Sequence, residues 1–283
     1  MTVNNNVSAL SALNSYNTNL NSMSSSMNKL STGSRINSAA DDASGLMISE
    51  KMRSQITSLE QAMKNSKDAV SFLQTADGAL GQTTDILQRM RELVVQAQNT
   101  GTMTEENKHS ISLELEEMRD EINRIAKSTT FNGKNILDGT FTTGSEAYFK
   151  IGASSSSSDS ISVKIDDMSA KGLSQDKLAD FSISLDTEED MARTLENIDY
   201  AINEVLNQRA TIGATENRLE YSMRNLETTT TNLTAAESRI RDVDIVEEIT
   251  KYKNEMLKAE TSLRMMAQAN QQPSMVLTLL QGM

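Results

Sequence analysis

The stretch IDYAINEVLNQRATIGATENRLEYSMRNLETTTTNLTAAESRI, residues 198–240, decides the fold class of this 283-residue chain. Alternate steps of four and three residues from Ile198 to Ile240 visit thirteen positions, and nine of these are aliphatic or Met. The exceptions are Arg209, Glu216, Thr230 and Glu237. A 3.5-residue repeat sustained over this length is typical of a coiled coil. We therefore predict that a helix over 188–240 packs along another long helix.

The obvious partner within the chain is a helix over residues 44–99. Its apolar positions step by three, four and seven residues: Ile48, Met52, Leu59, Ala62, Ala69, Leu73, Ala76, Leu80, Leu87, Met90 and Val94. At a rise of 1.5 Å per residue, such a helix would be about 84 Å long. One proline and twelve glycines leave little to interrupt it. A shorter helix over 105–127, with Thr104 as its N-cap, is predicted to follow.

Residues 138–186 change character, because apolar residues alternate at 147, 149 and 151, at 161, 163 and 165, and at 181, 183 and 185. This alternation predicts short strands. The predicted fold is mainly α: a long-helix coiled-coil bundle with a small β-hairpin region, in which the N- and C-terminal halves pack together. We expect residues 1–40 and 241–283 to form a terminal domain, and residues 44–240 to form a bundle domain with its β insert at about 138–186.

Both ends of the chain lack charge. Residues 1–28 and 265–283 contain no Asp, Glu, Lys, Arg or His, although the chain has 39 acidic and 27 basic side chains. Helical spacing predicts an apolar stripe over 5–30, and a last helix over 241–283 interrupted only near Pro273. Uncharged amphipathic ends on an acidic protein favour burial against other chains. The candidate self-assembly residues are Leu13, Leu20, Met27, Leu30, Val276, Leu277, Leu279 and Leu280.

Composition argues against several functions. A net charge of −12 disfavours nucleic-acid binding, and no apolar run approaches the length of a membrane span. We also expect no cleaved signal peptide, since the N-terminus lacks a basic segment followed by an apolar one. With no Cys and His109 as the single His, thiol chemistry and two-histidine metal sites are excluded. Asp242 and Asp244 resemble part of a calcium loop, but that segment is predicted to be helical. We expect no enzyme activity and no cofactor.

Five motifs, in order, resemble bacterial flagellin. They are LSTGSRINSAADDASG at 30–45, QRMRELVVQA at 88–97, FNGKNIL at 131–137, AESRIRDVD at 236–244, and MAQANQQP at 266–273 followed by VLTLL at 276–280. The similarity spans about residues 1–165 and 187–283. Only about residues 166–186 occupy the place of the large variable outer domains of many flagellins. The chain therefore resembles a short, core-only flagellin.

The resemblance implies a secreted subunit that polymerises into the extracellular flagellar filament for motility. Its implied partners are further copies of itself, an export chaperone, the filament cap, hook-junction proteins and the Toll-like flagellin receptor of animal hosts. The matching receptor-binding and subunit-interface positions are Arg89, Arg91, Glu92, Leu93, Gln96, Ile111 and Glu114. From pattern alone, Arg89 and Glu92 equally form an ordinary helical ion pair and Leu93 packs inside. The alternatives to a filament subunit are a flagellin-like hook-filament junction protein and a secreted coiled-coil effector that binds a host protein.

Overall fold

The computed structural model describes residues 6–99, 101, 103–154, 156–174, 183–185 and 187–281, with side chains described for all of these except 157 and 273–281. The chain is mainly helical and divides into two compact units. One unit combines residues 1–56 with residues 231–283, and the other is residues 57–230. The helices α2 (Ala43–Ala97) and α4 (Glu188–Arg241) each contribute a part to both units.

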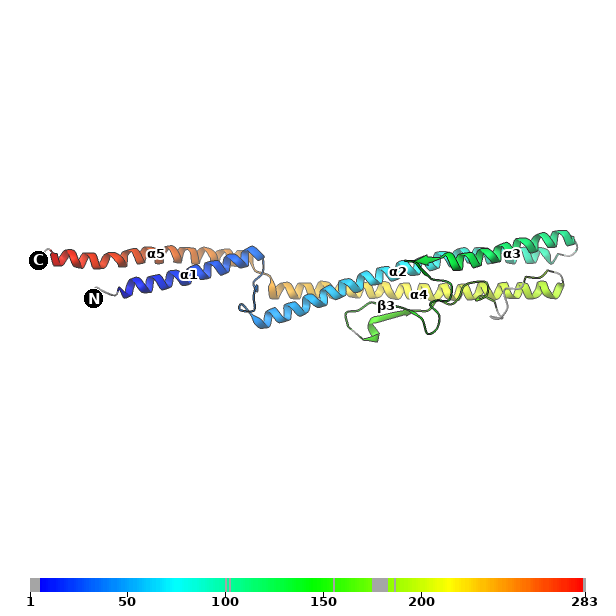
Figure 1. Cartoon of the computed structure of the whole chain (residues 1–283), viewed down its shortest axis with the longest axis horizontal. Helices are drawn as coiled ribbons and strands as arrows, with labels where there is room; N and C mark the ends of the chain where they lie inside the picture. The colour runs from blue at the N-terminus through cyan, green and yellow to red at the C-terminus, as the bar shows by residue number, and fades with distance from the viewer. Residues whose placement is uncertain are drawn as a thin grey trace. The chain divides into compact units, whose positions relative to one another are not determined.

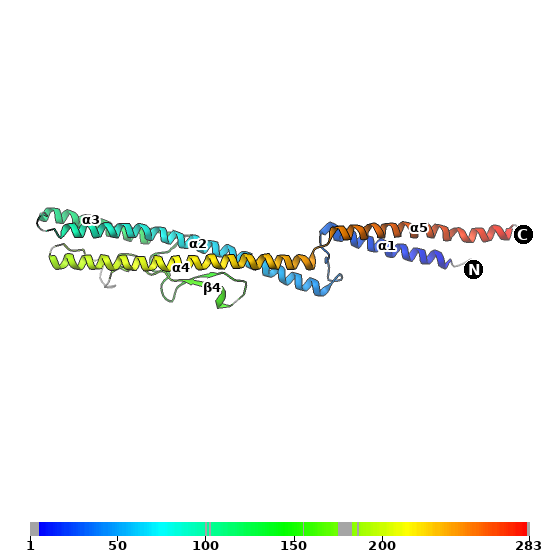
Figure 2. The ribbon, with the colours of Figure 1, turned by 180° about the vertical axis from the view of Figure 1, so that it is seen from behind.

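Within the 57–230 unit, α2 buries residues at strict heptad spacing. One row is Leu59, Ser66, Leu73, Leu80, Leu87 and Val94, and the other is Ala62, Ala69, Ala76, Thr83, Met90 and Ala97. The two rows form one seam along the helix, which is the pattern of knobs-into-holes packing. In Figure 1 and Figure 2, α2 and α4 lie side by side through this unit. The predicted coiled-coil pairing is confirmed.

The seam of α4 differs from the predicted register at two positions. Ile198, Val205, Ile212, Leu219 and Leu226 are buried at intervals of seven, as predicted. The intervening buried positions are Ala201 and Gln208, each one residue before the predicted Ile202 and Arg209. A small Ala and an amide fill the seam there, while the larger Ile202 and Arg209 are half-buried at its edge. A charged residue is tolerated at position 209 because this position lies at the margin of the seam.

Polar side chains join α2 and α4 across this margin. The Arg209 guanidinium donates to both carboxylate oxygens of Asp77, at 2.8 and 3.3 Å. Further along, the Gln74 amide donates to Glu216 at 2.7 Å. Two of the four polar exceptions to the predicted repeat therefore have cross-helix partners that fix how α4 is aligned with α2.

The helix α3 (Glu105–Ser128) and two antiparallel hairpins complete this unit. The first hairpin, β1 (Thr130–Phe131) with β2 (Lys134–Asn135), turns at Asn132 and Gly133, which both have positive φ. This conformation is the one that an Asn-Gly turn favours. The second hairpin pairs β3 (Ala147–Lys150) with β4 (Ser160–Val163), joined by a connection that contains the short 3-10 helix η1 (Ser157–Asp159).

An aromatic cluster attaches this β region to α2. The ring of Phe72 lies 5.4–5.7 Å, centroid to centroid, from the rings of Phe131, Phe141 and Phe149. Of the third predicted alternation, Ile183 and Leu185 form no strand although Leu185 is buried, and Phe181 lies outside the described residues. The backbone there has no neighbouring strand to pair with in the described part of the insert, so alternation alone did not produce one.

The other unit contains α1 (Val7–Thr32) and α5 (Ile245–Gln281), which lie antiparallel and side by side (Figure 1, Figure 2). Asn6 caps the start of α1, and Gly33 ends it in a left-handed conformation. Contrary to the predicted interruption, α5 continues through Pro273 to Gln281. A proline removes one N–H and distorts a helix locally, but here the helical path is retained.

Candidate assembly surfaces

The pairing of α1 and α5 depends on small residues. Ser26, Ala259 and Ala269 are buried. Because small side chains separate them, the two helices bring their Cα atoms within 8 Å of each other along the pair. The larger apolar residues of the pair are half-buried at most, as are Leu20, Met23 and Tyr252.

Many large apolar side chains of this unit are therefore exposed. Those on and beside α1 and α5 are Val7, Leu10, Leu13, Met27, Met47, Ile48, Ile245, Val246, Ile249, Met256, Leu257, Leu263 and Met265. Val246 is 76% exposed and Leu257 is 61% exposed. Many exposed large apolar side chains on one pair of helices are typical of an interaction site.

The candidate self-assembly residues of α1 lie at this surface to different extents. Leu13 and Met27 are exposed, whereas Leu20 and Leu30 are half-buried. Val276, Leu277, Leu279 and Leu280 belong to α5, but their side chains lie outside the described part of the chain. The sequence reading missed Ile249, Met256 and Leu263, because charged residues stand between them. Their spacing of seven residues was the available signal.

One end of the pair forms an open groove of about 510 Å³. Its walls come from both helices: Asn6, Val7, Ala9, Leu10 and Leu13 from the N-terminal side, and Met266 and Asn270 from α5. Charged residues are absent from this lining, so the groove suits an apolar or neutral polar occupant.

A second candidate surface lies where α2 faces α3. Arg89 donates to Glu92 on its own helix at 3.2 Å and pairs with Glu114 of α3 at 3.5 Å. All three side chains are between 45% and 70% exposed, so the ion pairs themselves stabilise the fold little. Gln96, on the same helix, is also exposed. Arg91 donates a hydrogen bond to Asp199 of α4 at 2.7 Å.

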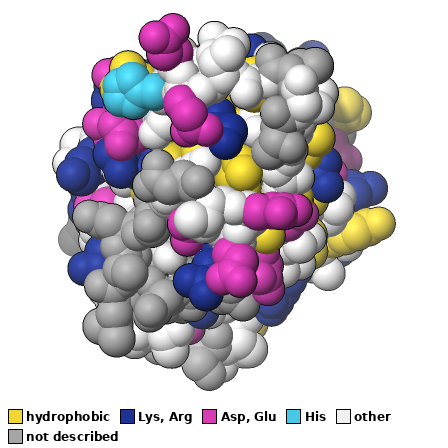
Figure 3. All heavy atoms as spheres, turned by 90° about the vertical axis from the view of Figure 1, so that its right-hand side faces the viewer, with side chains coloured by type: hydrophobic (Ala, Val, Ile, Leu, Met, Phe, Trp, Pro, Cys, Tyr) yellow, Lys and Arg dark blue, Asp and Glu magenta, His cyan; other side chains and the backbone are white. Residues whose placement is uncertain are grey.

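Two of the seven residues assigned to this surface are inside the unit. Leu93 is 3% exposed and Ile111 is 8% exposed, and both belong to the main apolar cluster. The structure therefore brings Arg89, Glu92 and Glu114 together at the surface and places Leu93 in the apolar core. Figure 3 shows a face of the molecule on which acidic and basic side chains are interspersed and the single His is exposed.

The structure gives no reactive role to the other chemically notable residues. Asp244 accepts hydrogen bonds from the backbone N–H groups of Val246 and Glu247 and so caps α5, while Asp242 accepts one from the Ser238 hydroxyl at 2.6 Å. Within the described ranges, no three His, Cys, Asp or Glu side chains gather as a metal site would require. None of the described helices is long and apolar enough to cross a membrane.

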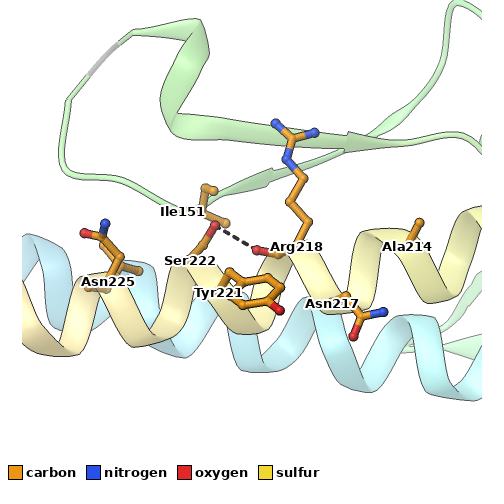
Figure 4. A pocket seen from close by; sticks show the side chains of 8 residues that line it. Ile151, Ala214, Asn217, Arg218, Tyr221, Ser222 and Asn225 are labelled. Atoms are coloured by element: carbon orange, nitrogen blue, oxygen red, sulfur yellow. Dashed lines mark hydrogen bonds between the residues drawn. The ribbon is translucent and has the colours of Figure 1, made fainter.

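An open groove of about 610 Å³ beside α4 is shown in Figure 4. Ile151, just after β3, faces α4 there, and the α4 lining includes Arg218, Ser222 and Asn225. Tyr221 is 67% exposed, with the Arg224 guanidinium 4.6 Å from its ring centre. The groove is open to solvent and holds no pair of groups arranged for acid-base or nucleophilic chemistry.

Comparison with known proteins agrees with this arrangement. Residues 3–142 match the family description "Bacterial flagellin N-terminal helical region", and residues 195–280 match "Bacterial flagellin C-terminal helical region". The chain is 46% identical to "Flagellin" of Bacillus subtilis (strain 168), over 99% of this chain and all of that protein. It is 42% identical to "Flagellar filament 33 kDa core protein" of Treponema phagedenis, over 99% and 100% of the two chains.

A solved structure of a putative flagellar hook-associated protein from Vibrio parahaemolyticus shares the fold, with a TM-score of 0.60. The two sequences are 15% identical, and the matched region covers 71% of this chain and all of the Vibrio chain. A likeness at this low sequence identity shows a shared fold only, whereas the two relatives matched over their full length show the family. The chain therefore belongs to the bacterial flagellins, and it is a structural, non-enzymatic subunit of the extracellular flagellar filament.

Proposed function

We propose that polymerisation is driven by the paired helices α1 and α5 and that residues 44–240 form a bundle able to fold without them. The observation that carries this proposal is the exposed apolar surface of α1 and α5. Fully burying one Leu, Ile or Met side chain is worth about 1.5–3 kcal/mol. Covering the eleven exposed apolar side chains of α1 and α5 with neighbouring copies would therefore supply a large driving force, even after the entropic cost of association.

Absence of charge suits this role. Residues 1–28 and 265–283 bring no charged side chain into the assembly, so burial there avoids the desolvation cost of such side chains. Leu13, Leu20, Met27 and Leu30 of α1 would be covered together with Val276, Leu277, Leu279 and Leu280 of α5. The same surface offers the apolar contacts that an export chaperone, the filament cap and hook-junction proteins would use.

Seeded elongation tests the proposal. Leu257→Asp places a charge at an exposed apolar position of α5, so the soluble subunit should keep its helicity. In the filament that charge would be buried unpaired, which costs several kcal/mol. We expect elongation from filament fragments, followed by electron microscopy, to fall by well over tenfold, since about 1.4 kcal/mol is tenfold.

Asn254→Asp is the matched control, because it adds the same charge to α5 at an exposed polar position and removes no apolar side chain. It should elongate far better than Leu257→Asp. If both variants elongate as the parent chain does, the α1–α5 surface is not the assembly surface.

A second role is proposed for the surface formed by Arg89, Glu92 and Glu114. Its exposed ion pairs contribute little to the fold, so these side chains are free to make intermolecular contacts. We propose that the surface, with Arg91 and Gln96 at its margin, contacts a neighbouring subunit in the filament and the Toll-like flagellin receptor in the free subunit. Leu93 and Ile111 support it from the core, so Leu93→Ala would act mainly by opening a cavity.

Receptor binding by subunits and by cross-linked filaments decides whether one surface has both roles. Arg89→Ala should weaken binding of the free subunit by about 1 kcal/mol or more, as for a central interface Arg. Arg124→Ala, which removes another exposed i,i+3 pair with Glu121, should leave binding unchanged. Intact filaments should bind much more weakly than subunits. Equal affinity for both forms would show that the surface is open in the polymer.

A further inference from the structure

The proline of α5 leaves a backbone carbonyl without its usual helical partner. In an α-helix the N–H of each residue donates to the carbonyl four positions earlier, and proline has no N–H. Pro273 therefore frees the carbonyl of Ala269. The residue is 92% buried, with 8% of its surface exposed, so water offers this oxygen little compensation.

The missing donor comes from the other end of the chain. The side-chain amide nitrogen of Asn6 donates to the Ala269 carbonyl at 2.7 Å. The amide oxygen of the same side chain accepts from the backbone N–H of Ala9 at 3.1 Å and so caps α1. Asn is suited to this double role because its amide carries both a donor and an acceptor. Aspartate could provide the cap but has no N–H to donate.

This bond and a second one fix the alignment of α1 along α5. At the opposite end of the pair, the Val243 N–H donates to the Gly33 carbonyl at 3.0 Å. The two bonds are 27 positions apart along α1 and its flanks (6 to 33) and 26 positions apart along α5 and its flank (243 to 269). Between them, the Asn19 amide donates to the Ser262 hydroxyl at 3.3 Å. Larger side chains of the pair, among them Leu20, Met23 and Tyr252, are half-buried, and these polar bonds add contacts that only one alignment of the two helices satisfies.

We propose that Asn6 is a positioning residue for self-assembly, which sets the register of α1 against α5 by occupying the carbonyl that Pro273 frees. Asn6 also lines the groove at this end of the pair, with Val7, Leu10 and Met266. A shift of register would move the walls of that groove apart and change the apolar surface offered to the next subunit. The inference rests on the proposed role of the paired helices α1 and α5 in polymerisation.

Four chains test the proposal by seeded elongation: the parent, Asn6→Asp, Pro273→Ala and the double variant. Asn6→Asp keeps the cap but turns an oxygen toward the Ala269 carbonyl, so elongation should fall at least fivefold. Pro273→Ala restores an N–H four residues after Ala269, which makes the Asn6 donor dispensable. In that background Asn6→Asp should lower elongation less than twofold. Asn14→Asp, an isosteric change at an exposed position of α1, is the control for added charge.

A register measurement separates this proposal from the proposed function. The chain has no Cys, so N19C with S262C provides a single disulfide pair at two side chains already in contact. Its oxidation yield in the soluble subunit should fall at least threefold on Asn6→Asp and recover with Pro273→Ala. Equal yields in all four chains would overturn the register role even if every chain elongates poorly. A parent chain that forms the disulfide but never elongates seeds would instead contradict the proposed function.

Discussion

At the residue scale, the polar side chains of this protein select among alignments that the apolar pattern leaves open. A heptad seam repeats every seven residues, so sliding one helix by seven positions preserves its apolar contacts. The bond from Arg209 to Asp77 and that from Gln74 to Glu216 are made in one alignment only. In the terminal unit, Asn6 and Asn19 have the same function for α1 and α5.

One such contact predicts a pH dependence. The Arg241 guanidinium donates to Glu50 and, through that hydrogen bond, holds the pKa of this carboxyl below its ordinary value of 4.5. A carboxyl whose pKa is lower in the folded state stabilises it fully above the ordinary pKa, and this contribution is lost as the pH falls through the folded-state pKa. Glu50→Gln should therefore lower the melting temperature slightly at pH 7 and make its decline below about pH 4.5 shallower.

Thermal unfolding between pH 7 and pH 3, followed by circular dichroism, checks this expectation. Glu60→Gln changes another exposed carboxylate of α2 and serves as the matched control. If Glu50→Gln and the parent lose stability in parallel on acidification, the bond to Arg241 does not contribute to acid sensitivity.

At the scale of elements, periodicity predicted the helices well. The observed α2, α3 and α4 begin and end within two residues of the ranges expected from the sequence. From Leu59 onward the seam of α2 followed the predicted positions, because small and aliphatic residues recur there, whereas the predicted Ile48 is exposed and Met52 is half-buried. In α4, two neighbouring residues were both acceptable at the second seam position, and only packing against α2 selected Ala201 and Gln208 over Ile202 and Arg209.

The candidate sites were harder to predict from the sequence than the helices were. Leu93 lies at a position of α2 where helical spacing could not decide between an exposed anchor and a core residue, and the structure places it in the main apolar cluster. The exposed residues of α5 were missed because burial depends on the partner, and the small Ala259 and Ala269 occupy the seam instead. The bond between Asn6 and Ala269 joins positions 263 apart, and no local pattern in the sequence could reveal it.

At the scale of the whole chain, the two compact units differ in the residues that they leave exposed. The 57–230 unit buries a continuous apolar cluster formed by three helices and the β region. The unit that contains both termini has a narrow seam and a wide apolar exterior. A subunit of this kind can keep its bundle folded while its terminal helices await contact with other copies.

Seeded elongation by a chain without residues 1–40 and 245–283 tests the central claim most directly. This truncation keeps α2 and α4 whole, from Ala43 to Arg241, and with them the polar bonds that align the bundle. We predict a soluble, helical monomer that fails to elongate filament fragments under conditions in which the full chain elongates them. Filament growth from the truncated chain at the rate of the full chain would contradict the account.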